Sequence, residues 1–180
     1  MWGTNANCYA YACNCRNPAN GIRGAAIPGG FARYGVFPKQ NETPAQYCER
    51  LVMGVLADAS ANGLPKAASS NDIRTLPYAG SGYIIGMVYN AVGFHFFRRD
   101  RFTKRWSWKD GIPEDATDKI NGPPNFTSQT VTDAKFIEAI STNRLAYIPN
   151  WSSMTFGAYF GFGDINGITV SGIATAQNVD

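Results

Sequence analysis

A cysteine near the start of this chain and its single histidine are the residues whose types suggest covalent chemistry. Cys8 lies in the segment Asn7–Ala12, and His95 lies in the segment Phe94–Arg99, past the midpoint. An imidazole beside a thiol can hold it as a thiolate, which is the reactive form of a cysteine nucleophile. Two residues so far apart in sequence meet only through the fold. We therefore expect the fold to bring Cys8 and His95 together.

The chemistry that such a pair predicts is acyl transfer. Cys8 would attack an amide carbonyl, His95 would protonate the leaving amine, and water would then release the acyl group. Asn7, the backbone N–H of Cys8 or a nearby tyrosine would stabilise the oxyanion, and the residues alone leave this choice open.

Cys8 lies at the start of a predicted helix. Asn5 or Asn7 is a suitable N-cap, and the alanines and tyrosines that follow permit a helix over about residues 5–13. Cys8 would then lie in the first turn, where free backbone N–H groups and the positive end of the helix dipole favour a thiolate.

A second helix is predicted over about residues 44–61 from its end signals. Thr43 and Gln46 form a capping box, and Pro44 takes the first helical position. The apolar stripe of this helix includes Cys48, which we therefore interpret as a small core residue. The Gly- and Pro-rich residues 14–43 between the two helices predict a long loop, of the kind that is usually functional or flexible.

His95 lies on the middle one of three predicted strands. These are Tyr83–Tyr89, Phe94–Arg99 and Trp106–Lys109. On the middle strand, Phe94, Phe96 and Arg98 share one face, and His95, Phe97 and Arg99 share the other.

The C-terminal part from residue 145 is rich in predicted strands. Thr132 is expected to cap a helix before it, and Asn166-Gly167 is a hairpin turn signal within it. The expected strands are Leu145–Pro149, Met154–Phe162 and Ile168–Ala174. This order of elements is typical of an α+β fold with an antiparallel sheet, and the length favours a single domain over residues 1–180.

Composition and charge exclude several classes of protein. With 44% hydrophobic and 13% aromatic residues the chain is globular, and a net charge of +3 demands no polyanionic partner. Residues 1–6 are too short and polar for a secretion signal, and no apolar run reaches the roughly 20 residues that span a bilayer. We therefore expect a protein without a signal peptide or a membrane span, either cytoplasmic or associated with a virion.

Two binding sites suggested by residue type are not expected to form. The cysteines could hold zinc with His95 in reserve, but the spacing of Cys8, Cys13 and Cys15 is irregular for zinc sites, so no metal or cofactor is expected. The basic residues between 98 and 109 alternate with aromatic ones and could bind nucleic acid or teichoic acid. We interpret them instead as a solvated connection between strands, which makes a nucleic-acid partner unexpected.

Together, these segments resemble a little-characterised family of bacterial and phage proteins. Its members share an Asn-Cys-Tyr start, a His-aromatic-Arg strand and a Trp-Ser-x-Lys-x-Gly strand, which residues 7–9, 95–98 and 106–111 match here. A later Asp of the family corresponds to Asp118, and Trp108 replaces a second histidine that we expect in many relatives. The order of these residues is similar to that in papain-like cysteine peptidases and cell-wall amidases.

The resemblance implies a papain-like fold, in which the helix that carries Cys8 packs on the sheet that carries His95. It implies a cysteine hydrolase of amide bonds, a peptidase or a cell-wall amidase, acting on a protein or on peptidoglycan. Cys8, His95 and Asp118 would be catalytic. Asp118 would orient the imidazole, and Asn90, Asp110 and Asp115 are alternatives for that role.

A second hypothesis belongs to another class. The same fold could serve as a structural or binding protein, such as a phage virion component, in which Cys8 and His95 are idle. The loop at 14–43 and the glycine-rich, apolar residues 154–174 could both pack on other subunits.

Overall fold

A computed structural model of the chain describes residues 6–15, 26–33, 35–64, 66–76, 83–91, 93–99, 102, 105–108, 131–132, 154–163 and 168–172. Its helices are α1 (Cys8–Ala12), α2 (Pro44–Ala61) and the short 3₁₀ helix η1 (Ile73–Thr75). Its strands are β1 (Ala68–Ser70), β2 (Tyr83–Tyr89), β3 (Phe94–Arg99), β4 (Arg105–Ser107), β5 (Val131–Thr132) and β6 (Thr155–Phe162). Within these ranges, no helix is both long and apolar enough to cross a membrane.

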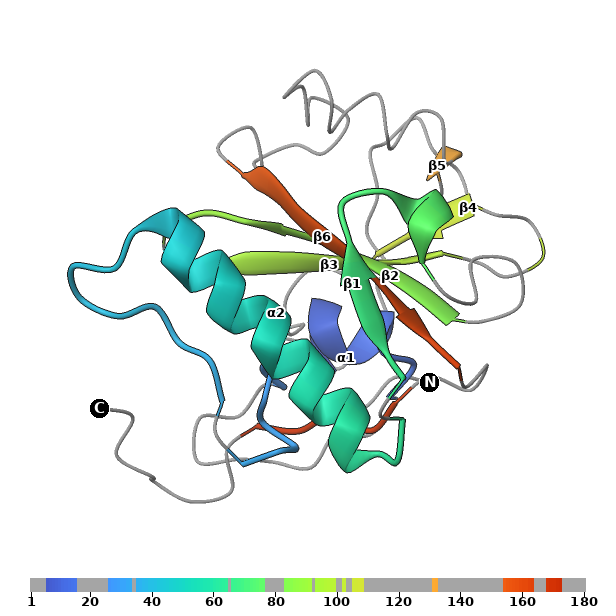
Figure 1. Cartoon of the computed structure of the whole chain (residues 1–180), viewed down its shortest axis with the longest axis horizontal. Coiled ribbons are helices and arrows are strands. Elements are labelled where there is room, and N and C mark those ends of the chain that lie inside the picture. Colours follow the sequence, from blue (N-terminus) through green and yellow to red (C-terminus); the bar gives the residue numbers. More distant parts are fainter. Residues whose placement is uncertain are drawn as a thin grey trace.

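The strands form one antiparallel sheet in the order β1-β6-β2-β3-β4-β5 (Figure 1). The hairpin of β2 and β3 follows from two apolar runs separated by a short turn, in which the Asn90 N–H donates to the Gly93 carbonyl at 3.0 Å. β6 comes from the far end of the described chain and inserts between β1 and β2. The combination of helices and an antiparallel sheet confirms the α+β prediction.

α2 begins where its capping residues predict, and α1 begins after Asn7, one of the two N-caps that the sequence offered. The side chain of Asn7 accepts from the Ala10 N–H at the start of α1, which confirms that Cys8 lies in the first turn. The capping box of Thr43 and Gln46 is present at the start of α2. Both helices therefore form largely as the local sequence dictates.

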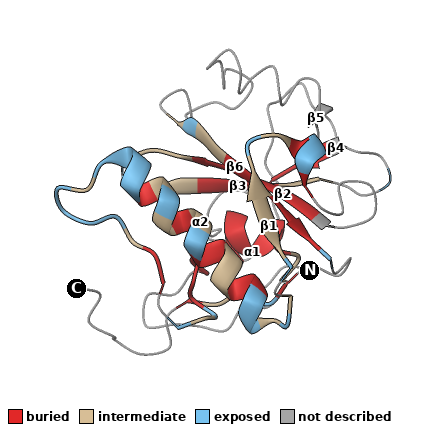
Figure 2. Cartoon of the chain, viewed as in Figure 1, coloured by how far each residue is buried: buried red, intermediate tan, exposed pale blue. Residues whose placement is uncertain are grey.

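The two faces of the sheet bury different residues, and we name them by what covers them. The helix-covered face packs against α1 and α2 and includes Ile85, Met87, Phe96, Phe160 and Phe162. The aromatic face is on the opposite side and includes Val88, Phe97, Trp106, Trp108 and Tyr159, with Ile73 and Leu76 from the η1 region packed on it. Figure 2 shows that α1 is buried throughout, whereas α2 presents one buried and one exposed side.

Two sequence-based assignments of elements differ from the structure. Thr132 lies in β5, where Val131 and Thr132 pair with β4, and the helix that Thr132 was expected to cap lies outside the described residues. Residues 168–172 do not form a strand, and there the Ser171 carbonyl accepts from the Ile27 N–H at 3.2 Å. The short β1 was not predicted, because its small polar residues carry no alternating pattern. The strand expected at 145–149 and the turn at 166–167 lie outside the described residues.

Candidate functional site: the α1–β3 junction and the pocket beside α2

Cys8 is buried at the start of α1, with only 5% of its surface exposed. The residue before it, Asn7, has both ends of its side-chain amide engaged. Its oxygen accepts from the Ala10 N–H at 3.1 Å, and its Nδ2 donates to the Ala26 carbonyl at 2.7 Å. Asn7 therefore ties the helix start to the following loop, and these contacts compete with its predicted role as an oxyanion donor.

His95 is buried on β3, directly opposite Val88 of β2. Its ring centroid lies 5.2 Å from that of Phe97, in an edge-to-face arrangement. Burial lowers the pKa of His95 well below its ordinary value, because a charged imidazolium would lose its hydration there. The imidazole is therefore held neutral among apolar neighbours.

The structure places Cys8 and His95 on opposite faces of the sheet. Directly opposed residues of neighbouring strands share a face, so His95 and Val88 both belong to the aromatic face. Cys8 packs with Phe96 on the helix-covered face. The thiolate–imidazole pair expected from the sequence is thus not brought together, because the strand alternation turns His95 away from α1.

The motif segments nevertheless meet at the α1–β3 junction, through their neighbouring residues. The Tyr9 and Phe96 rings lie 4.7 Å apart. The Arg98 guanidinium lies 4.3 Å from the Tyr11 ring centroid, and its Nη2 donates to the Tyr11 hydroxyl at 3.1 Å. The Tyr11 hydroxyl is also 2.8 Å from Ser107 Oγ.

Arg98 extends this network to the end of α1. Its Nη1 donates to the side-chain oxygen of Asn14 at 3.1 Å. The three motif segments, within residues 7–12, 94–99 and 106–111, are thus joined by hydrogen bonds and ring contacts that hold α1 on β3. These interactions give the motif residues a structural role.

Sequence reasoning missed a buried carboxylate, Asp58, on α2. Its Oδ2 accepts from the Tyr9 hydroxyl at 2.8 Å and from the Gly29 N–H at 2.9 Å, and its Oδ1 accepts from the Ala32 N–H at 2.9 Å. Burial raises the pKa of Asp58 to about 6, although these hydrogen bonds act in the opposite direction. Asp58 therefore fastens the loop at 26–33 to both helices.

One signal in the sequence could have revealed Asp58. It lies one turn after Gly54 on the buried side of α2, where an acid is unexpected in an apolar stripe. A Cβ at Gly54 would lie 2.9 Å from the Pro28 carbonyl carbon, so glycine is needed for the loop to come this close.

The buried thiol of Cys13 lies next to this carboxylate. Burial raises the pKa of Cys13 well above its ordinary value, and the charge of Asp58 raises it further. Burial likewise raises the pKa of the Tyr9 phenol. Neither group is activated as a nucleophile here.

The remaining sequence candidates are not assembled into a site. Asp118, Asp110 and Asp115 lie outside the described residues. Asn90 is in the turn after β2. All four cysteines are free thiols, and the described part of the chain contains no group of three or more His, Cys, Asp or Glu that could hold a metal ion.

A pocket of about 700 Å³ lies elsewhere, between the first half of α2, β6 and the end of β1. We call it the α2–β1 pocket. Val52 and Met53 contribute apolar walls, and Ser69, Ser70 and Asn71 contribute polar groups. Cys48 and Tyr89 contact each other in its lining, where burial raises the pKa of Cys48 and the hydrogen bond from Tyr89 lowers it in part. Cys48, which the sequence placed in the core, packs against the core cluster and is half-buried.

Comparison with known proteins adds no relative. No protein-family model matches the chain, and neither the search of curated proteins nor the search of solved structures found a match. The site is therefore interpreted from its own geometry.

Proposed function

We propose that this chain is a binding protein rather than a Cys8–His95 hydrolase, and that its ligand site is the α2–β1 pocket. The observation that carries the proposal is the separation of Cys8 and His95 on the two faces of the sheet. A general base has to reach the proton that it removes, at hydrogen-bond distance or through one water. The motif residues around Cys8 serve instead to attach α1 to β3.

The pocket supports the binding half of the proposal. It is an open groove of about 700 Å³ that combines apolar walls with a few polar groups, a combination typical of ligand sites. Its thiol, Cys48, has a raised pKa, which makes it a poor nucleophile at neutral pH. The pocket is thus better suited to holding a molecule than to attacking one.

A papain-like cysteine peptidase or amidase is the second candidate. It is favoured by one observation, the position of Cys8 as the first residue of a helix that packs on an antiparallel sheet. A base other than His95 would have to approach Cys8 in that case. A role in a phage virion is supported by the sequence resemblance alone, and concentration-dependent assembly of the purified protein would favour it.

The alkylation rate of Cys8, measured against pH by peptide mass spectrometry, tests the proposal. We expect Cys8 to react no faster than an ordinary thiol. The variant His95→Phe should leave this alkylation rate of the folded protein unchanged. Cys15, a half-buried thiol seven residues after Cys8, serves as the internal comparison. Rapid alkylation of Cys8 below pH 7 that is lost in His95→Phe would overturn the proposal and restore the hydrolase.

A further inference from the structure

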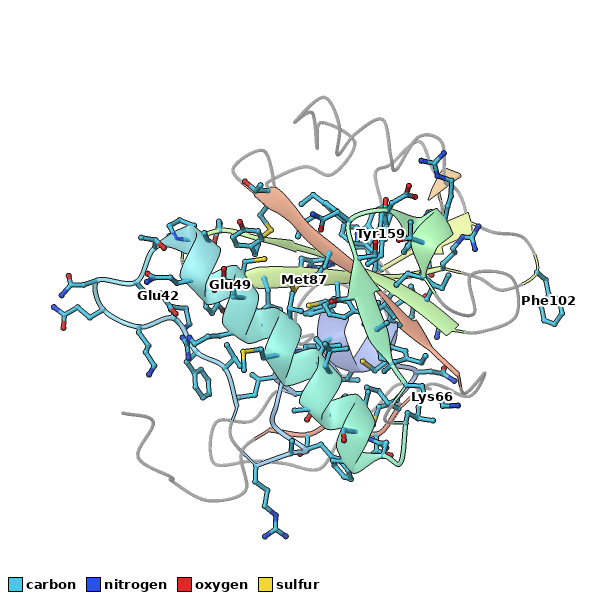
Figure 3. All side chains as sticks on the ribbon, in the orientation of Figure 1. Glu42, Glu49, Lys66, Met87, Phe102 and Tyr159 are labelled. Carbon is cyan, nitrogen blue, oxygen red and sulfur yellow. The ribbon has the colours of Figure 1, made fainter. Side chains whose placement is uncertain are left out.

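The charge of the α2–β1 pocket has a single sign. Among its lining residues in the described part of the chain, only Glu49 carries a formal charge at neutral pH. Glu49 is exposed on α2, three residues before Val52 and four before Met53, so the three side chains lie along adjacent sides of the helix. Figure 3 shows Glu49 on α2, with Met87 on the sheet behind the helix.

The pocket also contains an aromatic group suited to a cation. Tyr89 is one of the lining residues, its ring lies close to Gly157 of β6, and its hydroxyl is hydrogen-bonded to Cys48. The face of an aromatic ring attracts ammonium groups, most strongly where water is partly excluded. A carboxylate and a tyrosine in the same lining therefore favour a positively charged group.

The floor of the pocket is closely packed and fixes how deep a ligand can enter. A Cβ at Gly157 would lie 2.6 Å from Met87 Cε and 3.3 Å from Cys48 Sγ. No space for a ligand remains between these atoms and β6. A bound molecule would therefore rest against the Cys48–Tyr89 pair, and Cys48 would report its presence.

The exposed wall of the pocket is apolar. Met53 is 63% exposed, so its side chain is accessible to a ligand in the pocket. A flexible thioether side chain adapts to ligands of different shape. Together with Val52, it offers a surface for the apolar body of a ligand.

We infer that the α2–β1 pocket binds a small organic cation, with its ammonium group near Glu49 and Tyr89 and its apolar body against Val52 and Met53. The inference rests on the proposed binding function and names its ligand class. It does not involve Cys8 or His95.

Three probes of similar size and different charge test the inference. They are phenethylamine, 2-phenylethanol and 3-phenylpropionate, which are cationic, neutral and anionic. The measurement is the rate at which iodoacetamide alkylates Cys48 at mildly alkaline pH, followed by peptide mass spectrometry at increasing probe concentration. We expect phenethylamine to protect Cys48 at concentrations about two- to fivefold lower than the alcohol, as an exposed ion pair predicts, and the carboxylate to protect least.

Two pairs of variants locate the effect. Glu49→Gln should weaken protection by the amine about two- to fivefold and leave the alcohol unchanged, whereas Glu49→Asp should retain the preference. Ala45→Trp should fill the pocket mouth and abolish protection. Ala61→Trp is its matched control, because Ala61 is also exposed on α2 but does not line the pocket. Thermal unfolding of each variant confirms that it is folded.

Each outcome supports or overturns the inference. Protection by the amine that depends on Glu49 and is lost in Ala45→Trp supports it. Equal protection by the three probes would overturn the cationic ligand class, and no protection of the folded wild-type protein by phenethylamine would overturn the inference altogether. A failure of the proposed function is read at a different thiol, as fast, His95-dependent alkylation of Cys8, so the two failures are distinguishable.

Discussion

The helix-covered face of the sheet buries an acid, whereas the aromatic face buries a base. On the first, Asp58 accepts hydrogen bonds from Tyr9 and from the loop at 26–33. On the second, His95 lies among aromatic side chains such as Phe97. Burial raises the pKa of Asp58 to about 6 and lowers that of His95 well below its ordinary value. In both cases the fold disfavours the charged form, and the two groups therefore respond to pH in opposite directions.

The two faces are specified by different kinds of interaction. Directional hydrogen bonds place α1, α2 and the loop on the helix-covered face, and each depends on a named donor and acceptor. The aromatic face depends on volume and shape, with ring pairs such as Phe97–Trp108 at 5.9 Å and Trp106–Tyr159 at 5.8 Å. Substitutions on the two faces should therefore differ in size and in pH dependence.

Phe97→Ala on the aromatic face is expected to have the largest effect. The fully buried ring contacts Trp108 and His95, so its removal leaves a cavity and should lower the free energy of unfolding by about 3–5 kcal/mol. Urea unfolding at several pH values is the measurement, and Phe97→Leu should cost less because it fills more of the space. A loss below about 1 kcal/mol in Phe97→Ala would show that this face is not tightly packed.

Asp58→Asn on the helix-covered face should change the pH dependence of stability. The folded pKa of about 6 exceeds the ordinary value of 3.8, so the stabilisation from the protonated acid is complete below pH 3.8 and is lost as pH rises through about 6. A shift of this size corresponds to about 3 kcal/mol. In Asp58→Asn this decline with rising pH should disappear. Urea unfolding at several pH values measures this. If the free energy of unfolding of Asp58→Asn still fell between pH 4 and 6 as it does in the wild type, the assignment would be contradicted.

His95→Phe should change the profile in the opposite sense. Because the folded pKa of His95 is lowered, its contribution is present above its ordinary value of 6.5 and is lost as pH falls below it. Replacing it with an apolar ring should therefore reduce the loss of stability on acidification. Urea unfolding at several pH values measures this. A steeper loss of unfolding free energy on acidification in the variant would show that His95 is not buried as a neutral base.

Tyr11→Phe should have the smallest effect of the series. It removes the hydroxyl that bonds to Ser107 and Arg98 but keeps the ring beneath the guanidinium, so the expected cost is about 1 kcal/mol. A double-mutant cycle with Ser107→Ala separates this hydrogen bond from the rest. Full additivity of the two substitutions would show that this hydrogen bond does not stabilise the contact between α1 and β4.

The sequence predicted the helices and the β2–β3 hairpin well, because these elements depend on local signals. Capping residues fixed the starts of α1 and α2, and alternation of side chains assigned His95 to the face of Phe97. Local signals do not say which face of the sheet a distant helix covers. That choice depends on packing between α1 and Phe96, and it separates Cys8 from His95.

The candidate site could be predicted only in part for the same reason. The motif segments do meet, as the sequence led us to expect, but through Tyr9, Tyr11, Phe96, Arg98 and Ser107. The α2–β1 pocket could not be predicted, because β1 has no alternating pattern and its neighbour β6 is distant in sequence. Asp58 could have been predicted, because it is a lone acid on the buried side of a well-defined helix.

The insertion of β6 between β1 and β2 has a consequence for synthesis. A nascent chain emerging from the ribosome carries β1, β2 and β3 long before residues 155–162 are made. Until then, the β2–β3 hairpin has an open edge and an incomplete apolar surface, which is the kind of intermediate that aggregates or recruits chaperones. We therefore expect the sheet to close late, after most of the chain has left the exit tunnel.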